Sequence, residues 1–288
     1  MIYLILSIIF STSLVLIFKL FERFNINNFQ AIVFNYITAA FICYFTLKEP
    51  ININSITSEG WLPYSIMIGL MFISLFNLIA YSVQNVGISV TSVANKISLC
   101  IPVIFAFIYY GDSVSLIKVI GITLALFAVY FTSKNNEKKA SFNSILFIVP
   151  IVLFVGSGLL DVIFIHSLET FDLVNKGLVM KFSTILYTIA AIIGLPVLVI
   201  QHFTSNKIKM KNIMAGVLLG IPNVLSIVFF LRCLNHYPES SFVFPINNIG
   251  IVSASAISAR IIFNEHLSKI NWLGVFIAGV SLVLLSIA

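Results

Sequence analysis

Apolar stretches long enough to cross a membrane follow one another along almost the whole 288-residue chain. A helix needs about 20 apolar residues to span the hydrocarbon core of a bilayer. Ten stretches fit, at about residues 2–20, 29–47, 62–84, 88–110, 114–132, 144–166, 178–200, 213–234, 240–263 and 268–287. Only 9% of the residues are charged, against about 25% in a soluble domain. The sequence therefore predicts an integral, multi-pass membrane protein.

These stretches are continuously apolar and do not alternate over about ten residues, as the strands of a membrane barrel would. We therefore expect an all-α polytopic membrane protein with ten transmembrane helices. The stretch 2–20 is long for a signal peptide, and no small-residue cleavage pattern follows it, so we interpret it as the first span. The composition suits a bacterial inner (plasma) membrane.

A weak internal repeat relates two parts of the chain. Residues 95–121 recur in register at 248–274, an offset of 153 residues. The identical pairs are Asn95/Asn248, Ile104/Ile257, Ala106/Ala259, Ile108/Ile261, Ser115/Ser268, Ile117/Ile270, Gly121/Gly274 and Ala125/Ala278. In each copy an apolar run ends in a polar-acidic pair, and a glycine-bearing apolar run follows. Repeats of this kind in an apolar protein point to transport.

The most polar connection lies between the fifth and sixth stretches and divides the chain into two blocks. We predict a first five-helix repeat over 1–133, a polar linker over 134–143 and a second five-helix repeat over 144–288. Because five is odd, the second block must enter the membrane from the opposite side. The halves thus form an inverted repeat, which provides two nearly equivalent packings for alternating access.

The two-helix unit of the repeat resembles the drug/metabolite transporter superfamily, specifically the EamA-type ten-helix carriers. The residues that carry the resemblance are Gly111-Asp112 in the first copy and Phe263-Asn264-Glu265-His266-Leu267-Ser268, Trp272-Leu273-Gly274 and Gly279-Val280 in the second. The commoner form of the acidic motif is Gly-Glu. The resemblance implies a carrier of small organic solutes, commonly an exporter of amino acids, metabolites or drugs.

The acidic residues of the motif, Asp112 and Glu265, are interpreted as helix-end caps or turn formers and not as substrate ligands. The glycines Gly121, Gly274 and Gly279 are expected to allow close approach of neighbouring helices. Both interpretations are structural.

Ionisable residues inside the membrane are costly and usually face a cavity or one another. Lys96 lies within the fourth span beside Asn95, and Asp161 is the deepest carboxylate. At the repeat-related position of Lys96 stands Ile249, beside Asn247 and Asn248. We predict that the amides and Lys96 bind substrate, and the alternative is a buried Lys96–Asp161 pair that only stabilises the bundle.

Further polar residues interrupt other apolar runs and complete the predicted substrate site. They are Asn35, Asn77, Tyr81, Asn223 and Lys181. An isolated intramembrane asparagine often only links two helices, and Lys181 lies near its helix end, where its side chain could reach the interface.

Lys96 and Lys181 against one Asp161 make the interior net cationic. This favours an anionic or zwitterionic substrate, such as an amino acid. If transport is coupled to protons, Asp161 is the carboxylate expected to titrate; facilitated diffusion serves equally well. The alternatives are a channel and a proton-coupled drug exporter of the same fold.

Other classes of function fit the sequence poorly. The histidines His166, His202, His236 and His266 lie in four different links, so no catalytic or metal constellation is predicted. The three cysteines are scattered in apolar runs, and no cofactor is expected. The basic residues cluster in the links next to lipid headgroups, which argues against nucleic-acid binding.

The predicted partners are the lipid bilayer and a small-molecule substrate. The sequence does not choose between a monomer and a homodimer. The odd-numbered links carry more Lys and Arg than the even-numbered ones, which would put both termini outside, whereas the resemblance implies cytoplasmic termini. Both orientations stay open.

Overall fold

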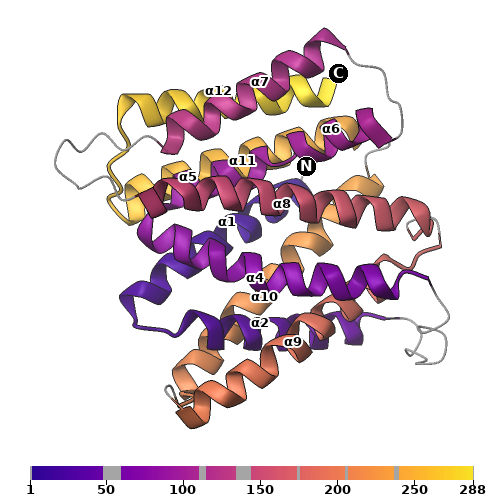
Figure 1. Ribbon diagram of the computed structural model, residues 1–288, viewed down its shortest axis with the longest axis vertical. Helices are drawn as coiled ribbons and strands as arrows, with labels where there is room; N and C mark the ends of the chain where they lie inside the picture. The colour runs from indigo at the N-terminus through magenta and orange to yellow at the C-terminus, as the bar shows by residue number, and fades with distance from the viewer. Residues whose placement is uncertain are drawn as a thin grey trace. The chain divides into compact units, whose positions relative to one another are not determined.

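The computed structural model describes residues 2–47, 60–109, 115–133, 144–173, 176–204, 207–236 and 240–287. The predicted linker 134–143 and the motif residue Asp112 lie outside this part of the chain. The regular elements of the described part are all helices (Figure 1). They are α1 (Ile2–Arg23), α2 (Asn28–Phe45), α4 (Leu62–Asn85), α5 (Ile88–Ile97), α6 (Cys100–Tyr109), α7 (Leu116–Ser133), α8 (Ser144–Thr170), α9 (Val179–Thr204), α10 (Met210–His236), α11 (Ser240–Ile262) and α12 (Lys269–Ile287).

Each predicted span contains a helix, and the helix ends lie within a few residues of the expected limits. Among the described residues, seven helical stretches are long and apolar enough to cross a membrane. Three shorter apolar helices cover Leu116–Thr132, Ile246–Ile262 and Lys269–Leu285. The predicted all-α polytopic fold is confirmed.

The fourth span differs from the expected single helix, because it is broken into α5 and α6 by a turn at Ser98 and Leu99. The cause is Pro102, which has no N–H to donate to the Ser98 carbonyl four residues earlier and whose ring collides with it. The Ser98 carbonyl instead accepts the N–H of Ile101, at 2.9 Å. At the position related to Pro102 by the repeat stands Ser255, and α11 runs through it without a break.

The chain forms two compact units, and each contains segments from both halves of the sequence. Unit 1 consists of Met1–Leu20, Leu78–Leu159 and Leu225–Ala288. Unit 2 consists of Phe21–Asn77 and Leu160–Val224.

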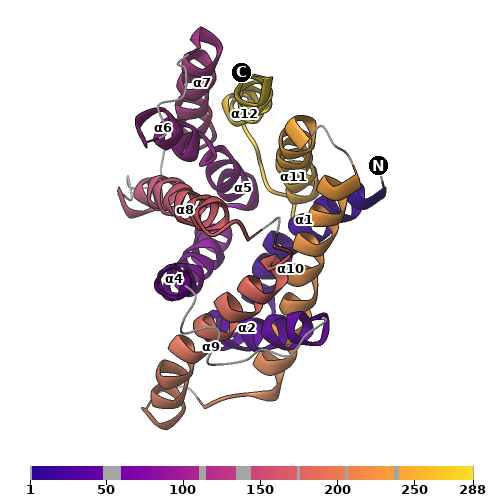
Figure 2. The same cartoon turned by 90° about the vertical axis from the view of Figure 1, so that its right-hand side faces the viewer.

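In unit 1, corresponding helices of the two halves pack against each other, α7 against α12 and α5 against α11 (Figure 2). A Cβ added at Gly121 would lie 2.9 Å from Leu285, and one added at Gly274 would lie 2.7 Å from Thr132. These contacts are reciprocal, since Gly274 and Leu285 are the repeat equivalents of Gly121 and Thr132. Reciprocal contacts are what a twofold relation between two copies produces.

The glycine expectation is correct at Gly121 and Gly274 and wrong at Gly279. A Cβ at Gly279 would be 3.9 Å from its nearest neighbour, Ile249, which is ordinary van der Waals contact. The α11–α12 packing therefore leaves room for a side chain there.

Unit 2 has the same reciprocal character, with α2 packed against α9. A Cβ at Gly69 would lie 2.7 Å from Ile189, and one at Gly220 would lie 2.7 Å from Thr38. Gly220 lies 151 residues after Gly69, and Ile189 lies 151 residues after Thr38. The second contact is therefore the repeat equivalent of the first. The contacts of α4 with α9 and of α10 with α2 are thus reciprocal, as the contacts of α7 with α12 are in unit 1.

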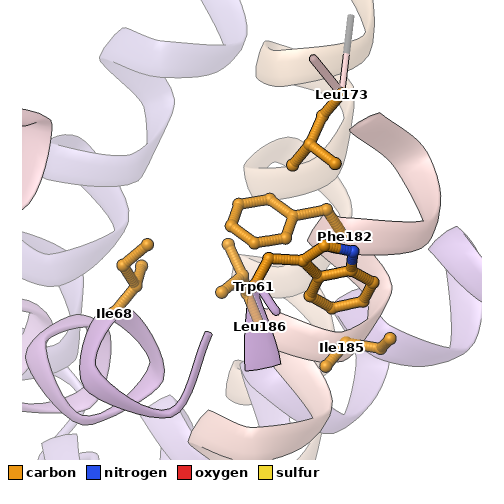
Figure 3. Close-up of a cluster of buried hydrophobic side chains, with 6 residues drawn as sticks. All are labelled: Trp61, Ile68, Leu173, Phe182, Ile185 and Leu186. Atoms are coloured by element: carbon orange, nitrogen blue, oxygen red, sulfur yellow. The ribbon is translucent and has the colours of Figure 1, made fainter. Parts of the chain in front are cut away.

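A separate apolar core of unit 2 surrounds Trp61, which lies just before α4. The Trp61 and Phe182 rings meet edge to face, with centroids 5.4 Å apart and planes at 82° (Figure 3). The other buried members of this cluster are Ile68, Leu173, Ile185 and Leu186. This core holds the start of α4 against α9.

Substitution of Gly274 by alanine should destabilise the protein, whereas Gly279→Ala should be tolerated. The methyl group that alanine adds at position 274 would lie 2.7 Å from the backbone nitrogen of Thr132. α7 and α12 would therefore have to separate. Overpacking of this kind costs about 1–3 kcal/mol. Thermal unfolding midpoints of the purified variants in detergent test this, and equal midpoints for the two variants would contradict it.

Candidate functional site

The break in the fourth span lies beside two of the predicted site residues in unit 1. Asn95 and Lys96 occupy the last turn of α5, and both are half-buried. The Ser98 hydroxyl donates to the Asn95 carbonyl at 2.6 Å, which satisfies one of the carbonyl groups exposed by the helix end. A cation in the last turn also interacts favourably with the helix dipole. Lys96 thus places positive charge beside a discontinuity in the backbone.

The asparagine pair of the second half lies on α11, which packs against α5. Asn247 is 6% exposed, and its side-chain oxygen has no hydrogen-bond partner within the described structure. Asn248 is half-buried. A buried acceptor left unpaired costs about 1–3 kcal/mol, so Asn247 is suited to receive a donor from a ligand.

Two serines on the same helices have similar unmet hydrogen-bonding capacity. The hydroxyls of Ser92 on α5 and Ser255 on α11 are buried and, in the part of the chain that the structure describes, without a partner. Sequence reasoning missed both, because a serine in an apolar helix is ordinarily a packing residue that bonds its own backbone. Together with Asn247 they form a set of unpaired polar groups on α5 and α11.

The acidic residue Glu265 lies at the opposite end of α5 from Lys96. Its carboxylate accepts the backbone N–H of Ile88 at 2.8 Å and that of Ser89 at 3.5 Å. The Ser89 hydroxyl donates to it at 3.4 Å. The interpretation of Glu265 as a helix-end cap is therefore confirmed, and Asp112 lies outside the described residues.

In unit 2, two of the predicted asparagines form a direct pair. Asn223 on α10 donates its amide to the side-chain oxygen of Asn35 on α2, at 3.1 Å, and both residues are buried. Gly216 and Gly220 on α10 permit this approach; a Cβ at Gly220 would lie 2.9 Å from the Asn35 carbonyl. The amide nitrogen of Asn35 keeps no partner among the described residues.

An aromatic cluster stands next to this pair along α2. Tyr36 stacks on Tyr187 and on Phe72, and its hydroxyl donates to the Phe72 carbonyl at 2.8 Å. Tyr187 is the equivalent of Tyr36 at an offset of 151 residues, yet its buried hydroxyl finds no partner in the described part of the chain. Sequence reasoning missed Tyr187. A comparison of the two halves at an offset of 151 residues would have paired it with Tyr36.

The remaining predicted residues are placed separately. Asn77 on α4 donates its amide to the Ile73 carbonyl of its own helix, at 2.7 Å. Tyr81, one turn later, is 42% exposed. Lys181 lies in the first turn of α9, and Asp161 lies inside α8; both are half-buried.

Lys96 and Asp161 each interact with other groups of the protein. Lys96 belongs to unit 1 and Asp161 to unit 2. The Lys96–Asp161 ion pair stays a prediction.

Two comparisons with known proteins bear on this arrangement. Residues 1–134 match the model of the EamA-like transporter family, a family of transporters and not of enzymes. A protein of Haemophilus influenzae, described only as uncharacterized, is 27% identical over 282 residues, which cover 94% of this chain and 93% of the relative. The resemblance noted from the sequence is confirmed over residues 1–134, somewhat less than half of the chain.

Asn35 and Asn223 are replaced by leucine, singly and together. The losses of unfolding free energy of the two single variants should add up to more than the loss of the double variant. A single change leaves a buried amide unpaired, at a cost of about 1–3 kcal/mol, whereas the double change removes both polar groups. Unfolding of Asn35→Leu, Asn223→Leu and the double variant forms a double-mutant cycle. Strictly additive changes in unfolding free energy would show that the pair contributes no coupling.

Proposed function

We propose that this chain, which matches the EamA-like transporter family over residues 1–134, is an alternating-access carrier that exports a small anionic or zwitterionic metabolite, such as an amino acid. The family is one of membrane transporters of small molecules. The substrate class, the direction and the mechanism are our proposal. We assign the protein to a bacterial inner membrane, in keeping with its composition and its relative in Haemophilus influenzae.

The observation that carries the proposal is the break between α5 and α6 beside Lys96. Irregular backbone at membrane depth is tolerated only where protein or a water-filled cavity satisfies it, and discontinuous helices form the substrate sites of many transporters. At the start of α6 the N–H groups of Ile101 and Val103 are already bonded to the carbonyls of Ser98 and Leu99, and Pro102 has no N–H. In the proposal the Lys96 ammonium therefore meets the anionic group of the ligand, and the carbonyl groups at the end of α5 meet its cationic group.

The polar groups around the break match a zwitterion. In the proposed complex the substrate carboxylate lies against Lys96 and Asn95, and an ammonium group donates to the unpaired Asn247 oxygen. Asn248 lies at the same level of the repeat as Asn95. A lipophilic cation would find Lys96 repulsive, which disfavours a drug-cation exporter.

The other predicted polar residues are proposed to contact substrate elsewhere on its path. They are Asn35, Asn223 and Lys181 in unit 2, and Asn77 and Tyr81 on α4. Within unit 2 the Asn35–Asn223 pair retains a free amide donor, which supports its inclusion.

Alternating access follows from the relation between the two sequence halves. In the proposal, repeats 1–133 and 144–288, joined by 134–143, exchange their conformations as the carrier turns over. The reciprocal contacts of Gly121 and Gly274 support this, because equal packing in both copies gives two arrangements of similar free energy.

Lys96→Ala should lower saturable transport in proteoliposomes by about ten- to hundredfold, because a charge-assisted hydrogen bond contributes about 1.5–3 kcal/mol. The screen uses radiolabelled amino acids and other small organic acids, with counterflow as the signature of a carrier. Lys207→Ala is the matched control, since the Lys207 side chain is exposed in the link before α10. Unchanged transport by Lys96→Ala would contradict the site, and single-channel conductance would contradict the carrier.

The same vesicles with an imposed pH gradient test the proposed coupling through Asp161. If Asp161 carries the proton, the gradient accelerates transport by the wild type and not by Asp161→Asn. If the rate of wild-type transport does not change with the pH gradient, transport is facilitated diffusion and is not coupled to protons. The carrier proposal itself would be unaffected.

A further inference from the structure

α5 carries Asn95 and Lys96 but is only ten residues long. The first N–H groups of a helix have no carbonyl partner within it, and in hydrocarbon such donors must be bonded by another part of the protein. The position of α5 therefore depends on the groups that its first N–H groups bond.

The N-terminal end of α5 is held from outside the helix. Its N-cap residue is Gly87, which supplies no side-chain hydrogen bond. The two donors at the start of the helix, the N–H groups of Ile88 and Ser89, go instead to the carboxylate of Glu265. An anion at this end also interacts favourably with the helix dipole, as Lys96 does at the other end.

Gly87 is required for this contact. Its φ of +128° lies in a region that residues with a side chain rarely adopt, and a Cβ there would be 2.8 Å from the Glu265 carboxylate oxygen. Gly87 thus provides no side-chain cap and leaves room for the carboxylate of Glu265, which lies 178 residues further along the sequence.

The link after α11 is shaped to deliver that carboxylate. Asn264 adopts a left-handed conformation with φ of +53°, which asparagine tolerates better than most residues. The next N–H, that of Glu265, turns back to the Ala259 carbonyl at 3.0 Å. Glu265 is therefore fixed at both its backbone and its side chain.

We infer that Glu265 is a positioning residue for the substrate site. By capping α5, the Glu265 carboxylate keeps the last turn of the helix, with Asn95 and Lys96, in helical register. Because Glu265 belongs to the second repeat and α5 to the first, the cap also ties the two repeats together within unit 1. The inference rests on the proposed function for the role of Lys96.

The start of α12, which follows this link, supplies a control. Asn271, in the first turn of α12, donates its amide to the carbonyls of Phe131 and Thr132 at 3.1 and 2.8 Å. These bonds cap the end of α7, which carries none of the proposed site residues. Asn271→Ala therefore removes a cross-repeat cap of similar kind, together with the bonds that the Asn271 side-chain oxygen accepts from Ser268. It leaves the Glu265 carboxylate and its bonds to α5 in place.

The experiment compares Glu265→Gln, Glu265→Ala and Asn271→Ala with the wild type in two measurements. The first is amide hydrogen exchange over residues 88–97 and 124–133 of the detergent-solubilised protein. The second is KM and maximal rate for the best amino acid in the proteoliposome screen. Exchange does not depend on transport, so the two measurements fail independently.

Glu265→Ala should accelerate exchange over 88–97 and raise KM by about fivefold or more, as expected for loss of a helix cap. Glu265→Gln keeps one acceptor and should lie between alanine and the wild type. Asn271→Ala should accelerate exchange only over 124–133 and leave KM unchanged.

The inference is overturned if Glu265→Ala leaves either exchange over 88–97 or KM at the wild-type value. It is also overturned if Asn271→Ala raises KM as much as Glu265→Ala does, because the effect would then be general loss of stability. A wild-type protein that transports no substrate would overturn the proposed function, whatever the exchange pattern.

Discussion

In hydrocarbon every backbone N–H and C=O must find a partner inside the protein, and Pro102 removes one of those donors in the fourth span. The helix ends at Ile97, turns at Ser98 and begins again at Cys100. Two properties of the molecule depend on this break. Lys96 lies in the last turn of α5 and not in mid-helix, and the carbonyl of Ser98 bonds the N–H of Ile101 instead of that of residue 102.

Packing and chemistry follow different rules in this protein. The close contacts of Gly121 with Leu285 and of Gly274 with Thr132 are equivalent in the two copies, which fits the proposed exchange between two arrangements of similar free energy. The polar residues are not equivalent. Ile249 stands where Lys96 would be, and Ser255 stands where Pro102 would be. A single asymmetric ligand needs only one set of charged groups, so the asymmetry is compatible with a symmetric scaffold.

The sequence predicted the helices well because membrane spans are fixed by one local property, the length of an apolar run. Glu265 was also recognised as a helix-end cap, since an acidic residue in a link between apolar runs can accept N–H groups at the start of a helix. Its partner could not be predicted, because Ile88 lies 177 residues away and no periodicity connects them. The Asn35–Asn223 pair is of the same kind: each residue was expected in the site, but the bond between them depends on Gly216 and Gly220. Gly279 shows the reverse case, where a glycine of the motif has no close neighbour.

The central claim is that the broken fourth span is the substrate site. Pro102→Ser gives this span the residue found at the equivalent position of α11 and restores the donor to the Ser98 carbonyl. The direct measurement is the initial rate of saturable substrate exchange in proteoliposomes, at equal amounts of folded protein. We predict that the variant folds at least as stably as the wild type but exchanges substrate about tenfold more slowly or worse. Exchange at the wild-type rate and KM would contradict the account.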